Sequence, residues 1–140
     1  EITAFQLHIA KLAKRLEVYE YLRDREIDIF QPIADELSEA YSQVSPQLIE
    51  KALKLWLSIM RYCAMAMLLN NPEYLKEGVL DWLTDTVKAH QMQSIEIAIY
   101  DLLSSKLKKS LPEDQFALMQ PFLEQTQEIL GEKVTTTIGA

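Results

Sequence analysis

Apolar residues recur at helical spacing along the whole chain and nowhere alternate over a long stretch. This spacing predicts six helices, of which the first runs from about 3 to 21 and the second follows a polar break around Asp24. The first helix has a narrow apolar stripe of Phe5, Ile9, Leu12, Leu16 and Tyr19. The second has Ile27, Phe30, Ile33, Leu37 and Tyr41. The pattern therefore predicts an all-α fold.

The third predicted helix has the widest apolar face. Ser45 is a good N-cap, and Pro46 fits the first turn, where its missing N–H costs nothing. The helix runs to about Leu69, with inward residues Leu48, Ala52, Leu55, Trp56, Ile59, Cys63, Met67 and Leu68. A stripe of this width is typical of a helix buried on most sides, so we expect 46–69 to be the most buried part of the chain.

Three further helices follow. Asn71 caps the fourth ahead of Pro72, and its apolar residues are Leu75, Val79, Trp82 and Leu83. Ser94 caps the fifth, which turns Ile95, Ala98, Ile99, Leu102, Leu103 and Leu107 inward. The sixth opens at Leu111-Pro112-Glu113, carries Phe116, Met119, Phe122, Leu123 and Leu130, and stops at Gly131. We expect one domain over 1–140 with a frayed tail at 131–140.

Charge and composition narrow the partners. The net charge is −7 and the pI about 4.8, which disfavours nucleic acid and anionic lipid as partners because both repel an acidic surface. No apolar run approaches the ~20 residues needed to span a bilayer, and the first residues lack a signal-like block. One cysteine excludes an internal disulfide. These features favour a cytoplasmic protein.

Signatures of catalysis are missing: the sequence contains no HExxH, GxGxxG, P-loop or GxSxG motif. With two histidines, little material exists for a metal site or a triad, so we expect no enzyme. His90 is either a histidine favoured near a helix C-terminus or an axial ligand of haem iron. Cys63 is either an inert buried thiol or a covalent attachment point. Met60, Met65 and Met67 fit core packing better than a cofactor cavity.

The stretch "LSIMRYCAMAMLLNNPEYLKEGVLDWLTDT" resembles the phycobilisome proteins, the globin-like light-harvesting subunits of the allophycocyanin and phycocyanin type. The shared features are Arg61-Tyr62, the small and apolar residues 64–69, the corner at Asn71-Pro72, and Val79-Leu80 with Leu83 and Thr86. The resemblance is clearest over about 40 residues and looser over most of the chain. It implies a globin-like arrangement of the helices.

The chain departs from the light-harvesting members at their bilin attachment motif. That Cys-x-Arg-Asp motif aligns with Ala52, Lys54 and Leu55, so both the cysteine and the aspartate are absent. Attachment in the antenna manner is therefore excluded, and the chain is more similar to the bilin-biosynthesis-associated globins. Cys63 lies eleven residues beyond Ala52, which returns it to within about 20° of the same helix face.

The resemblance implies a groove between the third and fourth helices that holds a linear tetrapyrrole. Arg61 or Lys54 would meet the propionates, Tyr62 and Trp82 would cover the rings, Cys63 would lie alongside, and His90 would lie opposite. Arg61 could equally form a structural salt bridge with Asp24 or Asp28. Such a protein would carry or store a bilin, perform no catalysis, and hand the bilin to biosynthetic enzymes.

Two alternatives stay open. One is a haem-binding sensor or oxygen-binding globin with His90 as the axial ligand. The other is a ligand-free globin-like scaffold that acts by dimerisation. Relatives of the phycobilisome type assemble through their N-terminal helices, so we expect a homodimer with the Phe5–Tyr19 stripe near its interface.

Overall fold

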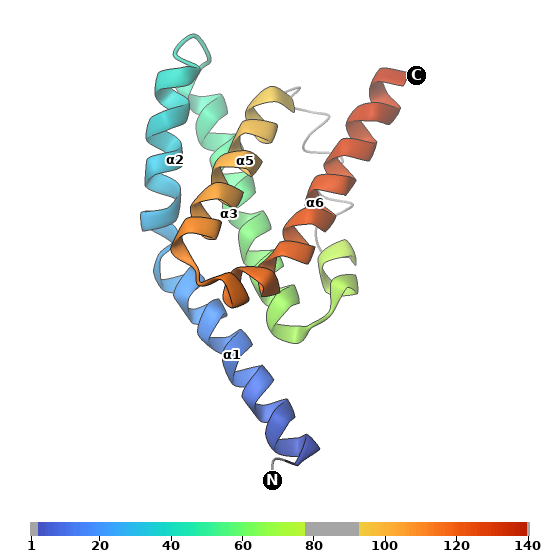
Figure 1. Ribbon diagram of the computed structural model, residues 1–140. Helices are drawn as coiled ribbons and strands as arrows, with labels where there is room; N and C mark the ends of the chain where they lie inside the picture. Colours follow the sequence, from blue (N-terminus) through green and yellow to red (C-terminus); the bar gives the residue numbers. More distant parts are fainter. Residues whose placement is uncertain (1–2, 78–92, 140) are drawn as a thin grey trace.

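The computed structural model describes the backbone of residues 3–77 and 93–139, and the side chains of residues 3–77 and 95–128. Figure 1 shows the elements α1 (Ala4–Asp24), α2 (Glu26–Ala40), α3 (Pro46–Leu69), α5 (Gln93–Ser110) and α6 (Glu113–Gly139). Residues 72–77 are also helical. Over the described ranges there is no strand, so the predicted all-α fold is confirmed.

α3 is the centre of the packing and contacts α1, α2, α5 and α6. It supplies ten buried residues, against three from α2 and two from α1. Trp56 and Ile59 have no exposed surface, and the Trp56 ring lies 5.9 Å from that of Tyr100 in α5. The helix with the widest apolar stripe, α3, is therefore the helix with the most buried residues.

The helix ends show which predicted signals operate. Asn71 Oδ1 accepts the backbone N–H of Glu73 at 3.0 Å, which is the N-cap bond expected there. Ser45 does precede α3, but its hydroxyl donates to Gln47 Oε1 and its side chain caps no backbone N–H. Asn70 ends α3 in the left-handed region at φ 51°, and the N–H of Asn71 bonds to Ala66 O at 2.9 Å.

Several predicted boundaries and faces are wrong. α6 runs through Gly131 to Gly139, where a helix stop and a frayed tail were expected. α5 is described from Gln93, so Ser94 lies inside the helix and is not its cap. In α2 the side chain of Ile27 is 78% exposed, and Ile29 is buried instead. Leu130, Val79, Leu80, Leu83 and Thr86 lie outside the residues whose side chains are described.

α1 packs on the body near its C-terminal end, and Tyr19 is the one residue of the predicted apolar stripe that takes part in this packing. Its buried residues are Val18 and Leu22, whereas Phe5, Ile9, Leu12 and Leu16 are 43–71% exposed. At 100° per residue, that stripe lies about 130° around the helix from Val18 and Leu22. The N-terminal turns of α1 extend away from the other helices (Figure 1).

α3 is long and apolar enough to cross a membrane by length and composition, contrary to the expectation from the sequence. Half of its most apolar stretch is buried inside the protein. The central helix of a compact helical core meets the same criterion, and α3 occupies that position.

Candidate functional site

Arg61, a residue of the predicted site, joins α3 to α2 through an ion pair. Arg61 Nε and Nη2 donate to the two carboxylate oxygens of Glu26 at 2.7 and 2.8 Å. This bidentate hydrogen bond raises the pKa of the Arg61 guanidinium. The partner expected from the sequence was Asp24 or Asp28, and the residue between them takes that place. Arg61 therefore has a structural partner.

A hollow of about 410 Å³ lies on one side of this ion pair. It is formed by the end of α1, the start of α2, the second half of α3 and Tyr74 beyond the corner. Its lining residues are Tyr19, Leu22, Arg23, Glu26, Met60, Arg61, Tyr62, Ala64, Met65 and Tyr74. We call it the Arg61 hollow.

The Arg61 hollow combines tyrosine rings with paired charges. The rings of Tyr62 and Tyr74 lie 5.9 Å apart at an interplanar angle of 38°. Arg23 Nε donates to Asp24 Oδ1 at 3.0 Å, so both arginines of the hollow have a carboxylate partner. Nη1 of Arg61 forms none of the hydrogen bonds to Glu26 and is a donor that could meet an anion.

A second hollow of about 450 Å³ lies between α2 and α3 on the other side of the ion pair. Its apolar lining includes Ile27, Phe30, Leu53 and Leu57. Lys54 belongs to this second hollow, where its ammonium lies 3.0 Å from Glu50 one turn away. The structure therefore does not bring Lys54 together with Tyr62 in one hollow.

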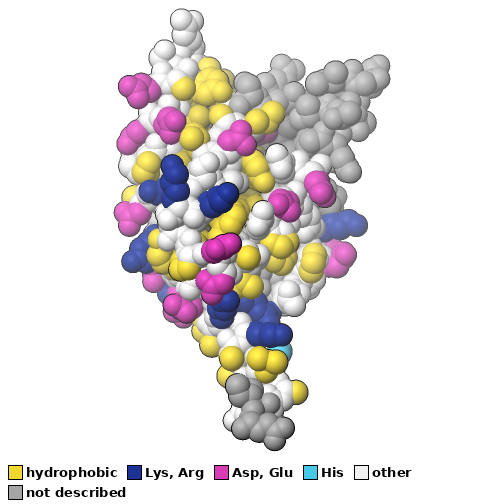
Figure 2. Space-filling view, in the orientation of Figure 1, with side chains coloured by type: hydrophobic (Ala, Val, Ile, Leu, Met, Phe, Trp, Pro, Cys, Tyr) yellow, Lys and Arg dark blue, Asp and Glu magenta, His cyan; other side chains and the backbone are white. Residues whose placement is uncertain are grey.

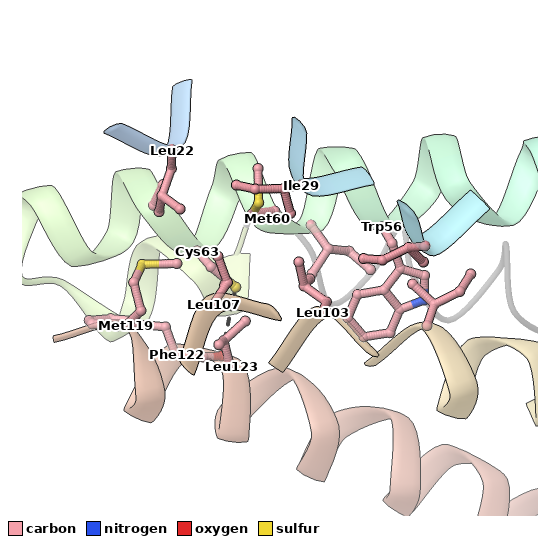
Figure 3. Packing of buried hydrophobic residues seen from close by; sticks show 14 of the residues in the cluster. Leu22, Ile29, Trp56, Met60, Cys63, Leu103, Leu107, Met119, Phe122 and Leu123 are labelled. Carbon is pink, nitrogen blue, oxygen red and sulfur yellow. Dashed lines mark hydrogen bonds between the residues drawn. The ribbon is translucent and has the colours of Figure 1, made fainter. Parts of the chain in front are cut away.

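Cys63 points to the opposite side of α3, which contradicts its predicted place in the same groove as Arg61 and Tyr62. Its Sγ lies 3.5 Å from Thr126 Oγ1 and 3.8 Å from Phe122 O, both in α6. Figure 3 shows the thiol among core side chains, with Leu107 and Phe122 close by. Burial raises the pKa of this thiol to about 12, so it stays protonated. Cys63 follows Arg61 by two residues, and two residues of an α-helix correspond to a rotation of about 200°. The two side chains therefore point to opposite sides of α3.

The remaining predicted residues divide into two groups. Trp82 and His90 lie outside the described residues. Met60 and Met67 are both buried in the core, and Met60 and Met65 also line the Arg61 hollow. Among the described residues, no group of three metal-ligating side chains is present.

Sequence reasoning missed Tyr19 and Tyr74 as lining residues and Glu96 as a buried acid. Glu96 is 4% exposed, and burial raises the pKa of its carboxyl to about 7. A signal was present: Glu96 precedes Ile99, Leu103 and Leu107 at the helical spacing of the inward face. An acidic residue in that register predicts burial.

Comparison with protein-family models, with curated proteins and with solved structures gives no match for this chain.

Proposed function

We propose that this chain is a non-catalytic binding protein that holds a linear tetrapyrrole without a covalent bond in the Arg61 hollow. The carrying observation is the hollow itself, which lies on the face of α3 that presents Arg61 and Tyr62 and which has tyrosine rings on its walls. The proposal includes the globin-like arrangement and the cytoplasmic carrier or storage role that the resemblance implies.

The lining suits a flat, mostly apolar molecule with carboxylate arms. Ligand sites in proteins are commonly of ~300–1,000 Å³, and this hollow of about 410 Å³ falls within that range. Tyr62 and Tyr74 offer ring faces, and Arg61 offers a donor for a propionate. A propionate competes with Glu26, which favours moderate over very tight affinity.

The proposal excludes a thioether to Cys63. That thiol is buried against α6 and protonated, whereas covalent attachment requires an accessible thiolate. We therefore expect the tetrapyrrole to be released completely when the protein is denatured.

The test is a titration with biliverdin, followed by absorbance. Wild-type protein should give a red-shifted bilin band, and Arg61→Ala should weaken the affinity by about 1.5–3 kcal/mol, the value of a charged hydrogen bond. Lys51→Ala removes the same charge from the exposed side of α3 and is the control, expected to leave the affinity unchanged. Unchanged affinity in folded Arg61→Ala would refute the site. A Soret band with haem, lost in His90→Ala, would favour the haem-binding alternative.

A second function, self-association through α1, has its own supporting observation. The stripe of Phe5, Ile9, Leu12 and Leu16 has the alternating spacing of three and four residues typical of helix pairing, and it faces away from the body. Figure 2 shows hydrophobic side chains on this projecting end of the molecule. A second copy of the chain presents the same stripe, so pairing is self-complementary.

Leu7 provides a matched control for this second function. It is 48% exposed, close to the 44% of Leu12, but lies about 170° around the helix from the stripe. Leu12→Glu should convert a dimer to a monomer by light scattering, and Leu7→Glu should not. A monomeric wild type at high micromolar concentration would rule out self-association.

A further inference from the structure

A third hollow, of about 340 Å³, lies where α1 leaves the body. Three helices form it, with Lys11, Lys14 and Arg15 from α1, Met67 and Asn70 from the end of α3, and Leu118 and Phe122 from α6. It shares no lining residue with the Arg61 hollow or with the α2–α3 hollow. We propose that this hollow binds a single-chain anionic amphiphile, a carboxylate or phosphate head on an apolar tail.

The charge of this hollow opposes that of the protein. The chain has 21 acidic and 14 basic residues, yet the lining has three basic side chains and no acidic one. The stretch from Ala4 to Leu16 also contains no acidic residue. Cations gathered at one concave site of an acidic protein create a local attraction for anions that the rest of the surface lacks.

These cations occupy the inward face of α1. At 100° per residue, Lys11, Lys14 and Arg15 fall on the same side of the helix as the buried Val18 and Leu22. That face is apolar where α1 packs on the body and cationic one or two turns earlier. The charged groups therefore point across the hollow toward α3 and α6, and their stems can lie along apolar surface.

The floor of the hollow is apolar. Met67 is 1% exposed and Phe122 is 6% exposed, and Leu118 is partly buried beside them. A wall of cations above a floor of thioether, aliphatic and aromatic side chains matches a ligand with one charged and one apolar end. A bare phosphate would make no contact with the apolar floor, and an uncharged apolar chain would form no ion pair with the cations.

Two of the three cations are available for a head group. Lys14 Nζ lies 2.8 Å from Asp114 Oδ2 at the start of α6, and this pairing lowers the pKa of the Asp114 carboxyl. Within the described part of the chain, no carboxylate lies at ion-pair distance from Lys11 or Arg15. Arg15 can bind a carboxylate or phosphate through two parallel hydrogen bonds.

The test is calorimetric titration of the full chain with decanoate at concentrations where it is monomeric. Wild type should bind, and Lys11→Gln/Arg15→Gln should weaken the affinity at least about ten-fold, the loss of one to two charged contacts. Lys108→Gln/Lys109→Gln removes the same charge from the exposed end of α5 and should leave the affinity unchanged. Circular dichroism would establish that both double variants are folded.

Asp114→Asn gives a test in the opposite direction. It frees Lys14 and should strengthen decanoate binding by about three-fold, the equivalent of one surface ion pair. Decyltrimethylammonium, with the same tail and a positive head, should not bind. Absence of decanoate binding, equal weakening in both double variants, equal affinity for the cationic amphiphile, or binding to anionic vesicles alone would each overturn the proposal.

Discussion

The thiol of Cys63 is enclosed by Thr126 and the carbonyl of Phe122, and its pKa is about 12. At pH 8 the thiolate fraction is then very small, so alkylation of the folded protein by iodoacetamide should be on the order of a thousand-fold slower than that of a free thiol. Mass spectrometry over time measures this rate, and the same protein in urea is the control. Rapid alkylation under native conditions would contradict the burial of Cys63.

Glu96 makes stability depend on pH. Its folded pKa of about 7 lies above the ordinary 4.5, so the folded state binds the proton more tightly than the unfolded state. This contribution is fully present below pH 4.5 and is lost as the pH rises through 7. Above that range the buried carboxylate destabilises the fold.

Glu96→Gln should therefore raise the free energy of unfolding at pH 8 by about 2–3 kcal/mol and change it little at pH 4.5. Urea unfolding at the two pH values measures the difference. Asp101→Asn, an exposed acid of the same helix, should show no such dependence. Equal effects of Glu96→Gln at both pH values would refute the raised pKa.

The partner of Arg61 illustrates what the sequence could and could not predict for a single residue. A structural salt bridge of Arg61 with Asp24 or Asp28 was one of the two interpretations of the sequence, and the structure has Glu26 as the partner. Which acid meets Arg61 depends on how α2 is rotated against α3, the helix that carries Arg61. The sequence pattern gives no information about this rotation.

At the scale of the helix, the end of α3 depends on Asn70. Its left-handed backbone at φ 51° costs most side chains about 1–2 kcal/mol and is tolerated by asparagine. Asn70→Ala should therefore lower the free energy of unfolding by about 1 kcal/mol, and Asn70→Gly should be neutral or stabilising. Chemical denaturation of both variants measures this. Equal stability of the two variants would contradict the role of the left-handed turn.

α1 shows why helix faces are harder to predict than helices. Its existence follows from periodicity, and a capping box of Thr3 with Gln6 fixes its start. Its longest apolar stripe was expected to contact the core or a partner helix. The body in fact packs against the C-terminal part of α1, through Val18, Tyr19 and Leu22, because α1 is longer than the surface that it packs against. A segment of α1 this short contains too few inward residues to give a clear hydrophobic periodicity in the sequence.

The error at Gly131 has a similar origin. Glycine is a common helix stop, but a glycine inside a helix costs only about 1 kcal/mol. α6 continues eight residues beyond it to Gly139. The helix therefore continues through Gly131 although glycine at this position favours a helix end.

At the scale of the whole molecule, the core should be independent of the projecting part of α1. Residues 3–13 are all exposed, so none of them belongs to the buried core of the monomer. Deletion of residues 1–10 should lower the melting temperature by no more than about 2–4 °C, the effect of roughly 1 kcal/mol or less in a chain of this size. Thermal circular dichroism measures this, and a large loss would place these residues in a stabilising interface.

The core itself was largely predictable. The inward residues expected for α3 and α5 are buried or partly buried, because both helices are packed on most of their length and their apolar faces are wide. The hollows were not predictable in the same way, because each is lined by side chains of two or more helices and a local pattern does not specify how helices pack. Tyr19 and Tyr74 line the same hollow although they are 55 positions apart in the sequence, and no local pattern links them.

Glu26 stands directly after the single residue that separates α1 from α2, and it holds Arg61. A movement of α1 that is transmitted through Arg25 would therefore shift Glu26 relative to Arg61. A protein that binds α1 and a ligand that competes with Glu26 for Arg61 would then both act on Glu26. Allosteric coupling between the two would be reciprocal, so each would change the affinity of the other by the same factor.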